Sequence, residues 1–194
     1  MNFIIYDIET TGLSPDHHEI TQIAAVRMRD GEILSNETFA TFVKTEKPIP
    51  KFITNLTGIT NAQVRNAPPP AQALRDFARF AGRDAALVAH NGRRFDTQFI
   101  TETSRRHNIA EQTLPCIDTW EISQNLWHAG WHNLDALASR LCVKPPKHHQ
   151  RHDARADVII LAHCFQRMRH KLPQGIAPYM THKVTLPAIN NDRV

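Results

Sequence analysis

The sequence predicts a mixed α/β domain, and the order of its elements is the main reason. Three segments that fit antiparallel strands come first, and short strands that alternate with helices follow. The chain has 194 residues, of which 41% are hydrophobic and 22% charged, as in one globular domain with a sizeable core. We therefore expect one mixed sheet with flanking helices, without an internal repeat or a second domain.

Five strands are predicted in this sheet, at residues 3–6, 20–28, 33–43, 87–89 and 115–118. The first is an apolar run that ends at Asp7. The second and third are joined by a turn that contains Asp30-Gly31, and Asp-Gly is a strong hairpin signal. The last two are short segments between helical patterns, which is typical of interior strands.

Helical periodicity and its flanking breakers predict helices at 50–56, after Pro68-Pro69-Pro70, and at 95–107, 119–127, 133–141 and 153–171. The helix after the prolines carries apolar residues on one face, at Leu74, Phe77, Ala78 and Ala81. Beyond Pro173 no clear element is predicted. We therefore expect a domain over residues 1–172 and a C-terminal tail over residues 173–194.

Charge and cysteine content indicate a class of partner and a compartment. The net charge of +4 and the pI of about 9.2 also fit an ordinary, mildly basic protein. From Arg140 to Lys171, however, eight Lys or Arg and five His stand against two Asp, which favours a polyanionic partner, nucleic acid before membrane. No signal peptide or membrane span is evident, and Cys116, Cys142 and Cys164 form no CxxC pair. We expect buried thiols in the reducing cytoplasm.

Two acids lie one residue apart at the end of the first strand. Residues i and i+2 of a strand point to the same face, so Asp7 and Glu9 project together. Like charges held this close repel unless a cation lies between them, and Mg²⁺ takes such oxygen ligands. Hydroxyls and backbone N–H groups of Thr10, Thr11 and Gly12 could then meet a nucleotide. The alternative is a solvated strand end that carries two acids by chance.

Two later stretches place further acids beside apolar segments. In LVAHNGRRFDTQFI (87–100), Asp96 begins a helix after an apolar strand and a turn, which favours the carboxyl edge of the sheet. In HDARADV (152–158), Asp153 is expected to cap the last helix, with His152 just before it and Asp157 in its first turns. His152 could then swing over a site to which Asp157 is fixed. The alternative for His152 is a solvated histidine in a loop. The alternative for Asp157 is an acid that only offsets the helix dipole.

Together these stretches resemble the three motifs of the DEDDh branch of the DnaQ-like 3′→5′ exonucleases. DIETTG (7–12), HNGRRFD (90–96) and HDARAD (152–157) agree with those motifs in order and separation, the third through its H-x-A-x-x-D pattern. Residues 49–64 resemble the helix-turn that precedes the second motif in the family. The resemblance covers roughly residues 3–171.

The resemblance implies a ribonuclease H-like fold and gives the residues roles. Asp7, Glu9, Asp96 and Asp157 would bind two Mg²⁺ or Mn²⁺ ions that clamp the scissile phosphate, and His152 would be the general base. Substrate contacts would come from the two first motifs, at Thr10, Thr11, Gly12, His90, Asn91, Arg93, Arg94 and Phe95. The second motif departs from the family because Arg93-Arg94 lengthen it by one residue. The extra arginine either contacts phosphate or is solvated.

The implied activity is metal-dependent 3′→5′ hydrolysis of single-stranded nucleic acid, DNA before RNA, with release of nucleoside 5′-monophosphates. The enzyme would serve DNA repair without a membrane partner, alone, as a homodimer or with a polymerase. The alternatives are a proofreading subunit of a DNA polymerase, a ribonuclease that trims 3′ ends, and a catalytically silent nucleic-acid-binding module. The tail lacks a glutamine-led apolar motif for a sliding clamp, and a silent module need not keep four acids and a histidine.

Three other signals are weaker. The histidine pairs His17-His18 and His148-His149 have no recognised zinc-ligand spacing. Cys116 lies in an apolar segment without an identifiable base. Trp120 is expected to pack in the core, whereas Trp127 and Trp131 flank a turn and either pack or stack on bases.

Overall fold

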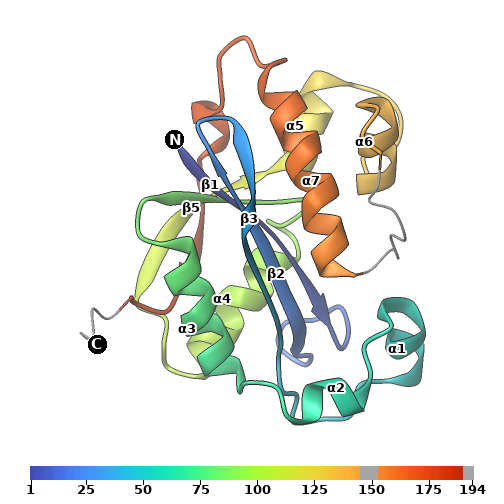
Figure 1. Ribbon diagram of the computed structural model, residues 1–194, viewed down its shortest axis with the longest axis vertical. Helices are drawn as coiled ribbons and strands as arrows, with labels where there is room; N and C mark the ends of the chain where they lie inside the picture. The colour runs from blue at the N-terminus through green and yellow to red at the C-terminus, as the bar shows by residue number, and fades with distance from the viewer. Residues whose placement is uncertain (145–152, 190–194) are drawn as a thin grey trace.

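A mixed sheet of six strands forms the centre of the protein, for which a computed structural model describes residues 1–144 and 153–189 (Figure 1). The spatial order of the strands is β3-β2-β1-β4-β5-β6. Their bounds are β1 Asn2–Thr10, β2 Ile20–Arg29, β3 Glu32–Phe42, β4 Ala85–Ala89, β5 Gln112–Asp118 and β6 His182–Leu186. β1, β4 and β5 are parallel, while β2, β3 and β6 run antiparallel to their neighbours. The predicted mixed α/β class is confirmed.

Helices cover both faces of this sheet. Their bounds are α1 Lys51–Thr57, α2 Asn61–Arg65, α3 Pro70–Ala81, α4 Asp96–Arg106, α5 Thr119–Leu126, α6 Leu134–Arg140 and α7 Ala154–Arg169, with a 3-10 turn at Ala177–Tyr179. α3 and α4 share one core with one face of the sheet, and α5, α6 and α7 share a second core with the other face. α1 and α2 form a small cluster of their own, seen at the lower right of Figure 1.

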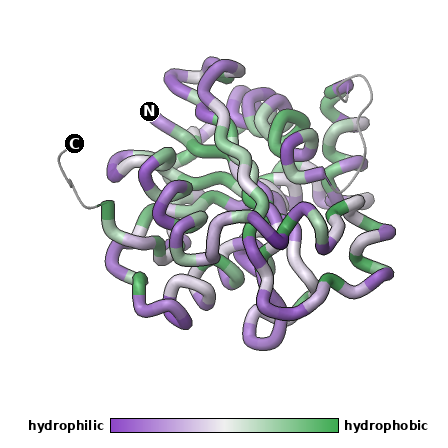
Figure 2. The backbone as a smooth tube through the Cα atoms, turned by 60° about the horizontal axis from the view of Figure 1, so that its bottom comes forward, coloured by the Kyte–Doolittle hydropathy of each residue, from purple (hydrophilic) through white to green (hydrophobic). Residues whose placement is uncertain are grey.

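The central strand β1 explains why the two cores are separate. Its first apolar residues are fully buried and alternate between the faces, with Phe3 in the core of α7 and Ile4 in the core of α3 and α4. The Phe3 ring meets Phe165 of α7 edge to face, with centroids 5.2 Å apart. Figure 2 shows hydrophobic colours mainly on the inner segments of the chain and hydrophilic colours on many of the outer ones. Helix α7 is thereby anchored along β1.

The sheet opens at the carboxyl end of β1. Parallel pairing between β1 and β4 runs only from Asn2 to Ile5, whereas antiparallel pairing with β2 continues to Thr10. A register shift between Glu9 and Thr10 marks a bulge or irregularity there. The second half of β1 therefore faces a notch where β4 has left the sheet, and the motif acids lie at this notch.

Two predictions about the sheet were wrong. The strand predicted to end at Asp7 continues to Thr10, so the paired acids lie within β1. The segment predicted as a tail without elements supplies the sixth strand, β6, where the sequence had predicted five strands. Buried Val184 and Leu186 alternate with more exposed Lys183 and Thr185, and this period-2 pattern is only five residues long.

Two predictions about single residues also need correction, and one that was left open is decided. Cys142 is exposed, at a positive φ of 55° directly after α6, while Cys116 and Cys164 are buried as predicted. Trp120 was expected in the core but is half-buried at the start of α5, outside the core clusters. Trp127, for which packing and stacking on bases were both open, packs against a core. The start of α5 turns residue 120 outward because Ile122 and Ser123 face inward. No helix among the described residues combines the length and hydropathy of a membrane span.

Candidate active site

Three of the motif acids converge at the notch. Ligand atoms of Asp7, Glu9 and Asp157 all lie within 4.8 Å of one another, and this is the one group of His, Cys, Asp or Glu with metal-ligand spacing in residues 1–144 and 153–189. Asp7 and Glu9 come from the same face of β1, as the i, i+2 spacing predicts. Carboxylates gathered in this way fit a hard divalent cation such as Mg²⁺ or Mn²⁺.

Helix α7 brings Asp157 to the pair on β1. Asp153 is its N-cap, and its carboxylate accepts a hydrogen bond from the Arg155 N–H at 3.1 Å, as the sequence predicts. Asp157 follows in the first turn, where it is buried. The apolar face of α7 packs on β1 and fixes the height at which its first turn meets the notch. Figure 1 shows the start of α7 near the tip of β1.

A cavity of about 360 Å³ surrounds these carboxylates. Residues that were predicted as site residues form much of its lining, at Asp7, Glu9, Thr10, Gly12, His90, Asn91, Phe95, Asp96 and Asp157. Sequence reasoning missed the remaining lining residues, Ile8, Leu13, Ile53, Leu56, Thr57, Asn133 and Leu134. Asn133 carried a local signal, because it caps α6 through its side chain at 2.9 Å from the Ala136 nitrogen. Residues 49–64 resembled a helix-turn of the family, but no local pattern assigned the apolar residues of α1 to the site, because only the tertiary fold brings α1 to the notch.

Asp96 lies in the same cavity, but its carboxylate is turned to the backbone of β1. Its Oδ1 accepts a hydrogen bond from the Ile8 N–H at 3.2 Å, at the level where β4 no longer pairs with β1. The side chain is 3% exposed, and burial raises the pKa of Asp96 to about 7, with a smaller contribution from the Asp118 carboxylate. A cation in the cavity would offset this desolvation and favour the ionised form.

The turn of the second motif is built by close packing and by a positive φ. Asn91 adopts φ 57°, which asparagine tolerates better than most residues. A Cβ at Gly92 would collide with the Cβ of Ala89, so only glycine fits between the turn and β4. Asn91 and the residues after it therefore leave β4 abruptly and carry Phe95 and Asp96 toward β1.

Asp118 at the end of β5 anchors this turn and was not predicted. Its carboxylate accepts hydrogen bonds from the N–H groups of Asn91 at 2.8 Å, Arg93 at 3.1 Å and Trp120 at 2.9 Å. Burial raises the pKa of Asp118, and the three N–H donors oppose that rise. The lengthened second motif is thus held by a buried acid of the neighbouring strand. Its sequence signal was its position, an acid that directly follows an apolar strand and caps the next helix.

The two arginines of the second motif lie outside the cavity lining of the described residues. The Arg93 guanidinium pairs with Glu121 at 2.9 Å. The Arg94 guanidinium carbon lies 4.9 Å from the centre of the Trp120 ring. Arg93 is thereby partly neutralised, whereas Arg94 keeps its charge on an aromatic surface.

The loop after β1 is closed on itself. The Thr10 hydroxyl donates to the Gly12 carbonyl at 2.6 Å, and Thr11 exchanges two hydrogen bonds with Glu19, through its N–H at 2.8 Å and its hydroxyl at 3.0 Å. Thr11 is therefore committed to the loop and lies outside the cavity lining, unlike Thr10 and Gly12. A Cβ at Gly12 would collide with the His18 ring, which explains the glycine.

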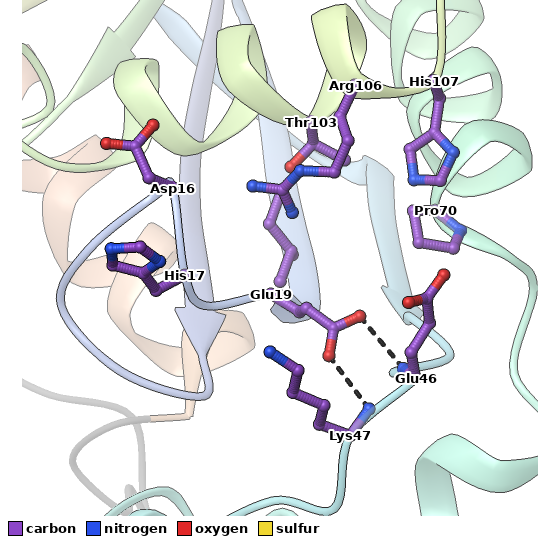
Figure 3. A pocket seen from close by; sticks show the side chains of 10 residues that line it. Asp16, His17, Glu19, Glu46, Lys47, Pro70, Thr103, Arg106 and His107 are labelled. Carbon is purple, nitrogen blue, oxygen red and sulfur yellow. Dashed lines mark hydrogen bonds between the residues drawn. The ribbon is translucent and has the colours of Figure 1, made fainter.

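Glu19 connects this loop to the segment before α1. Its carboxylate accepts hydrogen bonds from the N–H groups of Glu46 at 3.0 Å and Lys47 at 3.1 Å (Figure 3). These contacts lie at the edge of a second cavity of about 210 Å³. Its lining includes negatively charged residues such as Asp16 and positively charged ones such as Arg106. Glu19 thus fixes the approach to α1, which lines the active-site cavity through Ile53, Leu56 and Thr57.

Some predicted features fall elsewhere. His152, like His148-His149, lies outside the described residues. His17 and His18 belong to no metal-binding group within the part of the chain that the structure describes. The Cys116 thiol is buried, and burial raises its pKa to about 11, so it is not a thiolate nucleophile at neutral pH.

Comparisons with known proteins agree with the motifs. The model of the RNase_T family, described as exonuclease, matches residues 4–165. The DNA polymerase III PolC-type of Streptococcus mutans is 39% identical over 156 residues, which cover 79% of this chain and 10% of that protein. The corresponding protein of Streptococcus pneumoniae strain D39 is 37% identical over the same length. The chain thus spans about a tenth of the length of the curated relatives it matches.

Solved structures share the fold. Exonuclease X in complex with 5′-overhanging duplex DNA superposes with a TM-score of 0.74 at 24% identity, covering 92% of this chain and 96% of that one. The zinc-bound E. coli ExoI–ssDNA complex gives a TM-score of 0.73 at 19% identity, covering 89% of this chain and 41% of that one. The ribonuclease H-like architecture is thereby confirmed. With a family match over more than half of its length, the chain belongs to the RNase_T exonuclease family, the DnaQ-like 3′→5′ exonucleases.

Proposed function

We propose that this chain is a divalent-metal-dependent 3′→5′ exonuclease that removes nucleoside 5′-monophosphates from the 3′ end of single-stranded DNA. The observation that carries the proposal is the convergence of Asp7, Glu9 and Asp157 within 4.8 Å. Three carboxylates held this close fit a cation, because like charges repel in its absence. Two Mg²⁺ or Mn²⁺ ions, when bound, would supply charge stabilisation for the scissile phosphate and the leaving 3′-oxygen.

The side chains have separate tasks in this proposal. Asp7, Glu9 and Asp157 would hold the cation, and Asp96 would complete the ligand set, its carboxylate oriented by the Ile8 N–H, which favours the ionised form. His152 takes the proton from the attacking water, which a neutral imidazole can do near neutral pH. Thr10, Gly12, His90, Asn91 and Phe95 bind the terminal nucleotide, since each lines the cavity. We assign the enzyme to the cytoplasm, in keeping with its three free cysteines.

DNA is the favoured substrate because several proteins similar to this chain are named for DNA or were solved with it. The curated relatives named above are DNA polymerases, and two of the similar structures were solved with DNA. An RNA substrate remains the alternative that a direct assay separates, because discrimination depends on contacts to the 2′-hydroxyl.

The test is digestion of matched DNA and RNA oligomers labelled at the 5′ or the 3′ end. We expect 5′-labelled single-stranded DNA to shorten stepwise from its 3′ end with Mg²⁺ or Mn²⁺, and EDTA to abolish the reaction. Full turnover in excess EDTA would refute the metal site. Faster shortening of RNA would identify a 3′-trimming ribonuclease, and binding without hydrolysis a silent module.

A second candidate is a proofreading activity that works beside a polymerase. The observation in its favour is 39% identity to a PolC-type DNA polymerase over residues that make up 10% of that protein. Co-sedimentation with the host's replicative polymerase, and preferential removal of a mismatched 3′ terminus, would support it. Sedimentation of the chain alone would show whether it acts as a monomer or a homodimer.

A further inference from the structure

A row of aromatic and cationic side chains lies over α5 beside the active-site cavity. Arg94 of the second motif lies over the Trp120 ring at 4.9 Å, and Trp120 lies edge-on to the His132 ring with centroids 6.3 Å apart. Trp131, the neighbour of His132, is 80% exposed. We call Arg94, Trp120, Trp131 and His132 the aromatic ridge.

The loop that carries Trp131 is held in place by contacts on either side of it. Trp127 packs against a core, and the Arg140 guanidinium lies 5.1 Å from its ring centre while donating to the Ala129 carbonyl at 3.3 Å. Gly130 adopts φ 96°, a conformation that favours glycine. The His132 Nδ1 lies 2.7 Å from the Ser123 hydroxyl oxygen. These contacts fix the backbone on both sides of Trp131, so that its exposure follows from the fold of the loop.

Both ends of the ridge adjoin the active-site cavity. Arg94 directly precedes Phe95, and His132 directly precedes Asn133, and both of those neighbours line the cavity. Consecutive Cα atoms are about 3.8 Å apart, so the Cα of Trp131 lies at most about 7.6 Å from that of Asn133. A polymer that fills the cavity with its terminal unit can therefore reach the ridge with the units that follow.

The chemistry of the ridge fits a single strand of nucleic acid. It contains aromatic faces, an arginine and a histidine, and no acid. The nearby carboxylate of Glu121 is engaged by Arg93 at 2.9 Å and by His182 at 3.2 Å. Unpaired bases stack on aromatic side chains, and arginines pair with the phosphates between them.

We propose that the aromatic ridge binds the unpaired strand upstream of the 3′-terminal nucleotide, with Trp131 stacked on a base and Arg94 beside the backbone. This inference rests on the proposed function for the direction of the strand, since the terminal nucleotide occupies the cavity. It adds a length requirement: an oligomer must extend beyond the cavity to use the ridge.

The experiment measures binding without turnover. The anisotropy of a 5′-fluorescein thymidine mononucleotide, which can fill only the cavity, and of a 5′-fluorescein oligothymidylate of about twelve nucleotides is titrated with the EDTA-treated chain. A stacked base contributes an amount that corresponds to about 5- to 150-fold in Kd. We expect Trp131→Ala to raise the Kd for the longer ligand by that factor. The Kd for the shorter ligand should rise by less than about twofold. Trp131→Phe, which keeps a ring, should recover most of the loss.

A matched control tests whether charge or fold alone is responsible. Arg75 is exposed on α3, which covers the opposite face of the sheet, and Arg75→Ala should leave both affinities as they are. Arg94→Ala should raise the Kd for the longer ligand only. Melting temperatures within about 2 °C of the parent would show that the variants fold, as expected for an exposed Trp131.

The ridge and the proposed activity can fail separately. If Trp131→Ala binds the longer oligomer within twofold of the parent chain, the ridge is refuted, even where the chain digests DNA. If binding depends on Trp131 but the parent chain with Mg²⁺ releases no mononucleotides, the ridge is supported and the exonuclease proposal is refuted.

Discussion

Asp96→Asn should stabilise the metal-free protein at neutral and alkaline pH. The folded state raises the pKa of Asp96 from 3.8 to about 7, chiefly by burial. Between these two values the folded chain holds a proton that the unfolded chain has released, so the free energy of unfolding falls as pH rises. A difference of about 3 pKa units at 1.36 kcal/mol each sets an upper limit of about 4 kcal/mol, lost in full above about pH 7.

The asparagine removes this loss without removing the hydrogen bond to β1. Its side-chain oxygen can still accept from the Ile8 N–H, which Asp96 Oδ1 does at 3.2 Å. We therefore expect the gain from Asp96→Asn to be near zero below about pH 4, to grow between pH 4 and 7, and to level off above. Bound Mn²⁺ should cancel the gain, because the cation favours the aspartate that the variant lacks.

Urea unfolding in EDTA at pH 5, 6, 7 and 8 measures this dependence. Asp84→Asn is the matched control, an exposed acid just before β4 whose substitution should produce no such trend. A gain that is equal at pH 5 and pH 8, or a loss at both, would contradict the desolvation of Asp96.

The remaining predictions concern the base, the phosphate contacts and α1. His152→Ala should lower turnover by about 10²–10⁴-fold and abolish the rise of rate with pH, yet keep its Mn²⁺ affinity in calorimetric titration. Asp157→Ala should instead lose both turnover and Mn²⁺ affinity. Near-normal turnover of His152→Ala would show that this histidine is not the general base. Arg94→Ala should reduce the slope of log Kd for single-stranded DNA against log salt by about 0.7, the value of one phosphate contact, and an unchanged slope would leave Arg94 without a phosphate partner. Glu19→Ala should raise KM and lower the free energy of unfolding by about 1–2 kcal/mol, because two N–H groups before α1 lose their acceptor. Glu46→Ala keeps those hydrogen bonds and should change neither quantity. Equal effects of the two substitutions would show that Glu19 does not position α1.

The sequence by itself determined the elements and the motif residues that local rules can specify. The i, i+2 spacing of Asp7 and Glu9 placed both on one face of a strand, and Asp153 marked the start of α7 by its capping preference. Helix and strand positions followed from short-range periodicity, which acts between residues a few positions apart. The family resemblance then connected the motifs.

Only the tertiary structure decided how the site is closed. β4 leaves β1 after Ile5, and Asp96 takes the Ile8 N–H at the notch, a contact between residues 88 positions apart. Asp118 anchors the second motif from 25 to 27 positions away, and β6 joins the sheet edge through a pattern too short to predict. These features depend on which distant segments share a buried space, where unpaired backbone groups must find partners, and no local pattern encodes that choice.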